Sequence, residues 1–355
     1  MDFTPTPEQA AARDLAARIF GDLSTPERLA AAGTASDAEL WKALCAAGLP
    51  GAVEEVGLLG LVLLLEEQGR TTAQVPFAVS CVYGLLAVSA HGSTDQRARL
   101  LPGLRDGTEV ATGAFPARGG AGRVRAEDGR LTGAVPWVPW LRDATFVLVP
   151  AGDRGLWLVR TADAGCEPVE LTAPWRAGRL VLDGVRGERL GDGAGSGRGG
   201  GAAEVAYDDV LASARTAFAG LQAGVCAGSL ARAVAYTNER EQFGRPLAAK
   251  QAVQLRAAEA YMDTEAIRVT AYEAAWRRDG ALAYGTHALT AAWWASEAGR
   301  RVVHAGQHLH GGVGADVEFP VHRHFLWGRQ LDAYLGCGGE VLAELGDLIA
   351  TEESA

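Results

Sequence analysis

Residues 236–247 read Y-T-N-E-R-E-Q-F-G-R-P-L. Ahead of this stretch, apolar side chains recur at helical spacing from about residue 218 to 238. The F-G-R-P run at 243–246 interrupts the pattern, because glycine and proline both disfavour a continuous helix. Helical spacing then resumes from about 248 to 278. The stretch therefore predicts a tight break between two long helices, with the permanently charged Arg240 at its edge.

A second stretch, residues 308–314, reads H-L-H-G-G-V-G and is followed by E-F-P at 318–320. It closes another helical pattern that begins near residue 281, and its glycine pair breaks that helix. A last helical pattern runs from about 331 to 350. Four long helices with alanine-rich faces predict an antiparallel bundle, packed closely at small residues, over 213–355.

The N-terminal part, residues 1–107, is predicted to be helical. We predict that helices start where proline can occupy a first turn or where aspartate or serine can act as the N-cap. We predict that they end at glycine. The expected elements are a helix opening at Pro7-Glu8, one capped by Asp37 and stopped by Gly48, one over 58–69, one over 75–90, and a short one that Ser93 caps and that ends before Leu101-Pro102-Gly103.

Residues 108–212 change to glycine, proline and short β-rich runs, at 129–133, 145–149 and 156–159. Turn signals between such runs are typical of a compact β-barrel or sandwich. Residues 191–201, G-D-G-A-G-S-G-R-G-G-G, are interpreted as a flexible loop, because no strong strand precedes them and no G-K-[ST] follows. The expected fold is mostly α with a central β-domain, in the order N-terminal helical domain, middle β-barrel and C-terminal four-helix bundle.

The composition excludes several classes of protein. The 355-residue chain is 48% hydrophobic and 21% charged, so it can bury a substantial core. A net charge of −10 with scattered arginines does not provide the basic surface that nucleic acid requires. Of the 33 basic residues only Lys42 and Lys250 are lysine, a bias that we attribute to GC-rich coding.

The cysteines and the apolar runs predict that the protein is cytoplasmic. The five cysteines are dispersed and none forms C-x-x-C, which favours reduced thiols and a cytoplasmic protein. The N-terminus shows no basic region followed by an apolar one, so no signal peptide is expected. The apolar run at 57–65 is too short to span a bilayer, and we expect no membrane contact.

The two stretches resemble motifs of the acyl-CoA dehydrogenase family, Y-x-x-x-R-x-Q-F-G-x-P-[LI] followed by Q, and Q-x-H-G-G-x-G followed by E-Y-P. Gln251 stands at the glutamine of the first motif, and His308 replaces the leading glutamine of the second. Further matches follow in order along the chain: L-W and A-A-G-L within 40–49, E-E-Q-G-R at 66–70, L-P-G-L at 101–104 and Y-D-D-V at 207–210.

The resemblance implies a helical domain at 1–107, a β-domain at 108–212 and a four-helix domain at 213–355, with FAD at a subunit interface. It also implies that Arg240 reaches the pyrophosphate of a neighbouring subunit's FAD, a task for which a planar guanidinium is suited. The glycine pair would close on the adenosine half, where a Cβ would not fit. The cofactor contacts implied are Arg240, Gln242, Phe243, Gln251, His308, Gly311, Gly312 and Trp137.

The catalytic base of the family is missing. The family removes the α-proton of an acyl thioester with a glutamate while FAD takes the β-hydride. Counted from either motif, the family's E-G-T falls on 335–337, where the glutamate is replaced by Leu335. The alternative base position of the family falls on Ala214, beside a matching arginine. No catalytic residue is therefore expected, and the nearest acids, Glu340 and Asp332, fit the register poorly.

The β-domain shows a parallel loss. Where the family carries T-E-x-x-x-G-S-D against the flavin ring, residues 114–120 read A-F-P-A-R-G-G. The family's W-I-T becomes Trp137-Val138-Pro139, which keeps the tryptophan but loses the hydroxyl near the ring. The half-site that faces a neighbour's FAD is thus kept, while the half-site for this chain's own flavin ring is eroded.

These departures predict the subunit without a catalytic base in a heteromeric acyl-CoA dehydrogenase, similar to the α2β2 enzymes that oxidise steroid side-chain CoA thioesters. The expected partners are an acyl-CoA or acyl-carrier thioester and a second acyl-CoA dehydrogenase-like subunit that carries the glutamate. Two alternatives stay open: a homomeric enzyme of this fold turned to other chemistry, such as a cyclase or a carrier-protein-linked tailoring enzyme, and a non-enzymatic scaffold. Small residues at 220–228 hint at room for an acyl chain.

Five histidines gather between 304 and 324. His304 and His308 share one helix face, which is a spacing that zinc sites use. No carboxylate or cysteine completes a ligand pattern, and the flavin motif accounts for the stretch, so no metal is expected.

Overall fold

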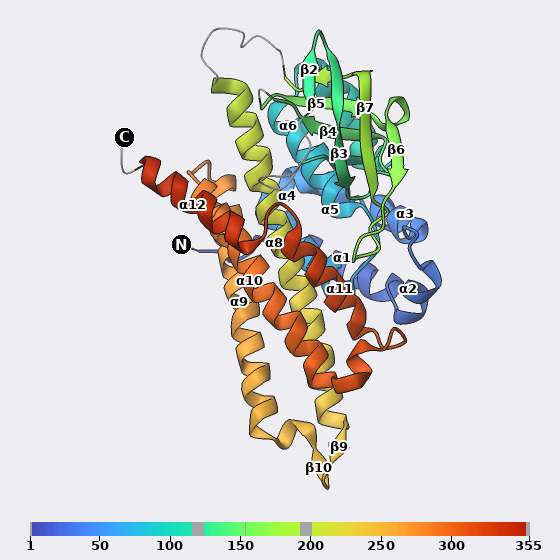
Figure 1. The fold of residues 1–355 in the computed structure, drawn as a ribbon, viewed down its shortest axis with the longest axis vertical. Helices are drawn as coiled ribbons and strands as arrows, with labels where there is room; N and C mark the ends of the chain where they lie inside the picture. The colour runs from blue at the N-terminus through green and yellow to red at the C-terminus, as the bar shows by residue number, and fades with distance from the viewer. Residues whose placement is uncertain (1, 116–123, 153, 192–200, 353–355) are drawn as a thin grey trace. The chain divides into compact units, whose positions relative to one another are not determined.

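The computed structural model describes residues 2–115, 124–152, 154–191 and 201–352. The chain order is helices, then strands, then helices, which confirms the mostly helical fold with a central β region (Figure 1). The chain divides into two compact units that are built from segments distant in sequence. Unit 1 comprises residues 1–29, 62–73 and 215–355, and unit 2 comprises 30–61 and 74–214.

The first four helices are α1 (Pro7–Leu23), α2 (Pro26–Ala32), α3 (Ala38–Ala46) and α4 (Leu49–Thr71). Two of them begin where the sequence predicts, α1 at Pro7 and α3 after Asp37, while α2 was not predicted and α4 begins ahead of the expected residue 58. A capping box joins Thr6 and Gln9 ahead of α1. Asp37 caps α3, because its Oδ1 accepts a hydrogen bond from the N–H of Leu40 at 2.9 Å. Helix α4 is interrupted at Gly57, whose φ is 71°, so its regular part agrees with the helix expected over 58–69.

The next helical run contains a π-helix. It consists of α5 (Phe77–Val79), the π-helix η1 (Ser80–Leu86) and α6 (Ala87–His91). It begins after Pro76 rather than at Val75, because proline restricts the residue before it to an extended backbone.

Helix α7 (Thr94–Asp106) ends later than the sequence predicts. Ser93 caps it as predicted, but the helix continues through Pro102 instead of ending before Leu101. Its leucines are buried along one face, and this burial outweighs the one backbone hydrogen bond that Pro102 cannot donate. The helix ends instead at Gly107, which has a left-handed backbone with a φ of 75°.

The described strands of unit 2 form two four-stranded sheets, β1-β4-β5-β8 and β2-β3-β7-β6. Strands β1 and β4 pair in parallel, and the other pairs are antiparallel. Side chains of both sheets share one core, in which Val135 and Leu180 of the second sheet meet Val147 and Val159 of the first. The strands are β1 (Ala111–Gly113), β2 (Arg125–Glu127), β3 (Arg130–Val138), β4 (Phe146–Pro150), β5 (Leu156–Arg160), β6 (Gly165–Pro168), β7 (Gly178–Arg186) and β8 (Glu188–Arg189), with the 3-10 turn η2 (Thr161–Asp163) after β5.

Long helices dominate the C-terminal part. Helices α8, α9 and α10 lie side by side in Figure 1, with the hairpin β9–β10 at one end. The elements are α8 (Gly201–Glu239), β9 (Glu241–Gln242), β10 (Arg245–Pro246), η3 (Leu247–Ala249), α9 (Gln251–Asp279), α10 (Gly285–His310), η4 (Gly311–Ala315), α11 (Val321–Ala333) and α12 (Gly338–Glu352). Helix α8 begins ahead of the helix expected from about 218, and most of the glycine-rich loop, 192–200, lies outside the described residues.

The single last helix expected over 331–350 is wrong. Helix α11 ends at Ala333 and α12 begins at Gly338. Between them Leu335 and Gly336 have φ angles of 65° and 110°, which no helix accommodates. Helical spacing on both sides of this corner conceals it in the sequence, because Leu335 carries an apolar side chain that fits the pattern.

The expectation that small residues at 220–228 leave room for an acyl chain is also wrong. Gly220, Gly224 and Gly228 lie on one face of α8, which packs against α4. A Cβ at Gly224 would lie 2.0 Å from the carbonyl oxygen of Glu66, and one at Gly228 would lie 2.3 Å from that of Arg70. The backbone of α4 occupies the space, so these glycines serve close helix packing.

Adding one methyl group to this contact tests its tightness. We expect Gly224→Ala to lower the free energy of unfolding by about 1–3 kcal/mol, because two helix backbones must separate. Gly346→Ala on α12 is the matched control: a Cβ there meets nothing within 4 Å. It should raise stability by up to about 1 kcal/mol. Equal urea denaturation curves for the two variants would contradict the close packing.

Among the described residues, one helix has the length and apolar character of a membrane span. It is Val205–Glu239, and 72% of its most apolar window is buried inside the protein. Helices α3 and α4 meet the same criterion only as a pair bent by 76°. Core helices of soluble proteins also pass this test, so it carries little weight for membrane insertion.

Candidate functional site

The predicted break at 243–246 is a β-hairpin. Gln242 pairs with Arg245, and the two residues between them, Phe243 and Gly244, have φ angles of 58° and 76°. Two consecutive left-handed residues form the turn that matches the twist of a two-residue hairpin. Phe243 is 92% exposed, and Lys250 Nζ lies 4.8 Å from the centre of its ring. A bulky residue held in this conformation and open to water is unfavourable by itself, which indicates a binding role.

Arg240 lies where α8 passes into this hairpin. Its N–H donates to the carbonyl of Tyr236 at 2.8 Å, and its own carbonyl accepts from the N–H of Leu247 at 2.9 Å. These bonds fix the backbone on both sides of the hairpin. The guanidinium is exposed and forms no ion pair with any residue in the described ranges, so it is available to an external anion. Gln242 and Gln251 are exposed on the same end of the unit.

The structure brings the two sequence motifs together. The ring of Tyr236, from the first motif, stacks on that of His310, from the second, with centroids 4.7 Å apart and planes 19° apart. His310 Nδ1 lies 2.7 Å from the carbonyl oxygen of Gly306, which holds the ring in place. The end of α8 and the end of α10 are therefore joined, while His308 stays exposed beside them.

The glycine pair forms an open surface. Gly311 has a φ of 66° and ends α10, so its backbone requires glycine. Apart from the adjoining residues of the chain, a Cβ at Gly311 or at Gly312 would meet no atom of the described residues within 4 Å. Any steric demand on Gly312 therefore comes from outside the chain. Exposed cationic, amide and glycine-backbone groups at one end of a unit have the chemistry to bind an anionic group such as the pyrophosphate of FAD.

The usual base position is a buried corner. Leu335 is 4% exposed, and its left-handed backbone turns the chain from α11 into α12. Its carbonyl oxygen lies 3.5 Å from the guanidinium of Arg215, which is itself buried. That guanidinium donates two hydrogen bonds, of 2.8 and 2.7 Å, to the carboxylate of Glu344 on α12. Ala214, the alternative base position, is fully buried as well.

The acids nearest to this corner have structural tasks. Glu340 Oε2 accepts a hydrogen bond from the N–H of Cys337 at 3.2 Å, which caps the start of α12. Asp332 accepts one from the Ser296 hydroxyl at 2.6 Å and another from Arg329 at 2.7 Å. Each carboxylate is engaged within its own unit. Arg215, beside Ala214, matches the family in sequence, but no sequence signal predicts its pairing with Glu344, 129 residues away.

The predicted ring-facing residue Trp137 lies in unit 2, on β3, and is half-buried. The carbonyl of Pro139, at the position of the family's hydroxyl residue, accepts a hydrogen bond of 2.6 Å from the buried Thr112 hydroxyl. Phe115 stacks between Tyr83 and Tyr207, with centroid distances of 5.2 and 5.7 Å. These three rings form an aromatic column within unit 2. Residues 116–120 of the altered segment at 114–120 lie outside the described residues.

A buried charge cluster went unrecognised in the sequence. The Glu66 carboxylate is 5% exposed and accepts a hydrogen bond of 3.0 Å from Arg268 on α9. Burial raises the pKa of Glu66, while the charge of Arg268 opposes that shift. Burial and the neighbouring Glu66 together raise the pKa of Tyr272. The E-E-Q-G-R match pointed to Glu66, but nothing in the sequence pointed to its partner 202 residues away.

The histidines between 304 and 324 have separate surroundings. His304 lies edge-on to Phe325, and His324 is buried with its Nε2 3.0 Å from the carbonyl of Arg70. No group of three or more histidine, cysteine, aspartate or glutamate residues in the described part of the chain could hold a metal ion.

His324 makes stability depend on pH. Burial lowers its pKa to about 4, so the folded protein keeps the ring neutral, whereas the unfolded chain protonates it near its ordinary value of about 6.5. The stability that this residue contributes is complete above that value and falls as the pH drops from about 6.5 to 4. Between pH 7 and 5 the loss is about 2 kcal/mol. His324→Gln should flatten this decline in urea denaturation, and an unchanged slope would contradict the assignment.

Comparison with known proteins agrees with this geometry. The family models of the acyl-CoA dehydrogenase N-terminal domain and C-terminal domain match residues 6–108 and 203–344. Acyl-CoA dehydrogenase FadE27 of Mycobacterium tuberculosis is 33% identical in an alignment 378 residues long. The alignment covers 99% of each chain. FadE28 of the same organism is 28% identical and covers 98% of each chain.

Solved structures share the fold over its whole length. A variant of the Tcur3481–Tcur3483 steroid ACAD is 39% identical with a TM-score of 0.90, over 98% of this chain and 99% of that chain. The ChsE4–ChsE5 complex from Mycobacterium tuberculosis is 30% identical with a TM-score of 0.89, over 99% of both chains. Butyryl-CoA dehydrogenase from Megasphaera elsdenii, 22% identical with a TM-score of 0.85, covers 99% of this chain and all of its own, and shares the fold. The chain belongs to the acyl-CoA dehydrogenase family.

Proposed function

We propose that this chain is one subunit of a heteromeric, FAD-dependent acyl-CoA dehydrogenase, that it lacks its own catalytic glutamate, and that it completes the FAD site of a partner subunit. The solved relatives named as the Tcur3481–Tcur3483 steroid ACAD and the ChsE4–ChsE5 complex support an assembly of two different chains. The substrate class that we propose is an acyl-CoA or acyl-carrier thioester, by analogy with the family.

The observation that carries the proposal is the state of the two base positions. Leu335 and Ala214 are buried apolar side chains, and the carboxylates around Leu335 cap a helix or pair with arginines. A general base must be available to the proton that it removes, whereas each of these carboxylates already accepts hydrogen bonds within the chain. The glutamate would therefore come from the partner.

The chain's own contribution is binding and orientation. When bound, FAD supplies the acceptor for the β-hydride of the thioester. Arg240 would pair with the pyrophosphate, since its guanidinium is exposed and free of ion pairs in the described ranges. Phe243 would dock against the partner surface around that cofactor, and Gly311–Gly312 would present backbone to the adenosine half. We also propose a cytoplasmic location and the three-part division at 107/108 and 212/213.

The decisive experiment compares the chain alone with the chain co-expressed with a candidate partner, an acyl-CoA dehydrogenase-like chain from the same genome that carries a glutamate at the base position. The chain alone should be colourless at 450 nm and should not reduce an electron acceptor with acyl-CoA. The co-purified pair should hold about one FAD per pair of chains and should turn over. Stoichiometric FAD and full turnover by the chain alone would refute the proposal.

A further inference from the structure

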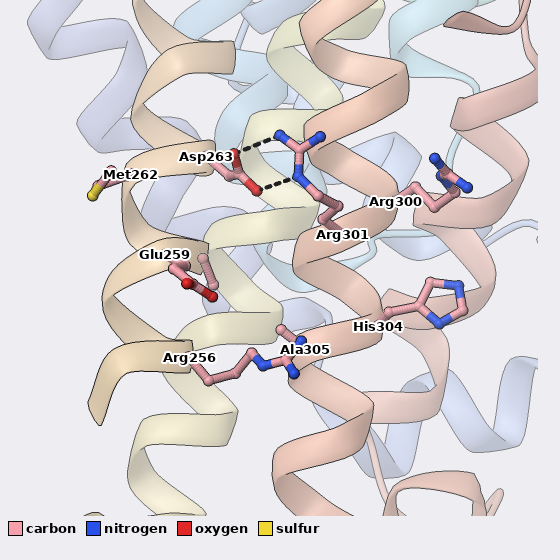
Figure 2. A pocket seen from close by; sticks show the side chains of 9 residues that line it. Arg256, Glu259, Met262, Asp263, Arg300, Arg301, His304 and Ala305 are labelled. Atoms are coloured by element: carbon pink, nitrogen blue, oxygen red, sulfur yellow. Dashed lines mark hydrogen bonds and ion pairs between the residues drawn. The ribbon is translucent and has the colours of Figure 1, made fainter. Parts of the chain in front are cut away.

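A half-buried arginine of α8 has no counter-ion among the described residues. Arg232 forms no hydrogen bond or ion pair with any residue in the part of the chain that the structure describes. Burial lowers the pKa of its guanidinium, because the charged form is partly removed from water. Other arginines of unit 1 meet an acid. Arg301, for example, donates two hydrogen bonds of 2.8 and 2.7 Å to the carboxylate of Asp263 (Figure 2). Arg232 therefore offers a charge that an external anion can compensate.

A second guanidinium lies beside the same buried histidine. His324 of α11 packs against Gly228 of α8, where a Cβ would lie 2.5 Å from the histidine Nε2. Arg232 lies one helical turn beyond Gly228 on α8, and Arg323 precedes His324 on α11. Burial is the main cause of the low pKa of His324, and the charges of Arg232 and Arg323 lower it further. Two positive charges thus act on one ring.

The start of α11 adds to this positive charge. Arg323 lies in its first turn, which contains no acid, and the N-terminal end of a helix carries a partial positive charge. The Nε of Arg323 donates to the hydroxyl of the buried Thr72, beyond the end of α4, at 3.4 Å. Burial lowers the pKa of Arg323 to about 10. An acid of α4 in this region, Glu67, is engaged by Arg70 at 3.1 Å. Unit 1 is therefore strongly positive where α4, α8 and α11 meet.

We propose that Arg232 and Arg323 hold a phosphate group at this meeting point of three helices. Planar guanidinium groups match phosphate oxygens with paired hydrogen bonds, and the negative charge would offset the desolvated charge of Arg232. Inorganic phosphate and the phosphate of a nucleotide share this chemistry. The site lies eight residues before Arg240 on α8, which is about 12 Å along the helix axis. It is separate from the cofactor contact proposed for Arg240 and does not depend on the proposed function.

The test follows thermal unfolding of the full chain as phosphate replaces chloride at constant ionic strength. The midpoint temperature should rise by about 5 °C when phosphate reaches about 100 times its dissociation constant, because a ligand of the folded state stabilises it. Arg232→Met should abolish this rise. In chloride alone the same variant should unfold at the wild-type temperature or above it, since methionine keeps an apolar stem without the charge. Arg232→Lys keeps the charge but not the planar fork, so it should keep part of the rise.

Two control variants separate this site from other anion contacts. Arg18→Met removes an exposed arginine of α1, and Arg240→Ala removes the arginine that we assign to the cofactor. Both variants should keep the rise that phosphate causes in the wild-type chain.

ADP in place of phosphate distinguishes the two sources of the phosphate group. A rise at lower concentrations of ADP than of phosphate, abolished by Arg232→Met, assigns the site to a nucleotide. A smaller or equal effect of ADP assigns it to the free anion. The proposal is overturned if phosphate causes no rise beyond that of chloride, if the rise survives Arg232→Met, or if the control variants lose it equally. None of these outcomes bears on the heteromeric assembly, which the FAD content of the co-purified pair tests.

Discussion

Replacing Arg240 by alanine is expected to strip FAD from the heteromeric complex. The guanidinium is exposed at the hairpin and is unpaired among the described residues, so its whole hydrogen-bonding capacity is available to the cofactor's pyrophosphate. A charge-assisted hydrogen-bonded contact contributes about 1.5–3 kcal/mol, so the dissociation constant of FAD should rise about 10- to 100-fold. Absorbance at 450 nm after gel filtration, and titration of the apo-complex with FAD, measure this change.

Two further variants distinguish recognition of the pyrophosphate by the planar guanidinium of Arg240 from a general effect of positive charge. Arg240→Lys keeps the charge but not the planar fork, so it should recover only part of the affinity. Arg245→Ala, on the same hairpin, removes another exposed arginine and should leave FAD retention within about twofold of wild type. An Arg240→Ala complex that stays fully yellow would contradict the assignment of Arg240 to the cofactor.

Replacing Arg268 by alanine is expected to destabilise the chain strongly. It leaves the Glu66 carboxylate, 5% exposed between α4 and α9, without the guanidinium that pairs with it at 3.0 Å. Removing one partner of a buried ion pair costs about 3–5 kcal/mol. Arg301→Ala is the matched control, because the side chain of Arg301 is 49% exposed in its pair with Asp263. That variant should lose at most about 1 kcal/mol in urea denaturation.

The direction of the pH dependence identifies Glu66 as the cause. Burial already raises the pKa of Glu66, and loss of Arg268 removes the charge that opposes the shift. The Arg268→Ala penalty should therefore be complete at neutral pH and shrink as acid protonates Glu66. Adding Glu66→Gln to Arg268→Ala should also recover stability at neutral pH. If Arg268→Ala lowers the free energy of unfolding equally at neutral and at acidic pH, the loss would come instead from packing of the arginine stem.

Local signals in the chain anticipated much of the fold. The F-G-R-P run predicted the break after α8, and Asp37 and Ser93 predicted helix starts, because capping and turn chemistry act between residues that are neighbours in sequence. The errors arose where burial overrides such signals. Helix α7 runs through Pro102, and the corner at Leu335 hides inside an apolar pattern.

Contacts between residues that are far apart in the sequence could not be predicted from the sequence alone. Glu66 and Arg268 are 202 residues apart, and Arg215 and Glu344 are 129 apart. No periodicity links such positions, since their pairing depends on how whole helices pack. The same holds for the glycine face of α8, which was interpreted as room for a ligand and is filled by α4.

The sequence by itself determined the family resemblance, the two motifs and the absence of a glutamate at 335 and 214, because those are properties of residue identity and spacing. Only the tertiary structure decided what these positions do. It buried Leu335 in a corner that Arg215 and Glu344 support, stacked Tyr236 on His310 so that the motifs meet, and left Phe243 exposed on a hairpin. Whether a side chain is exposed or buried depends on how the whole chain packs, because burial requires contacts from residues that are distant in sequence.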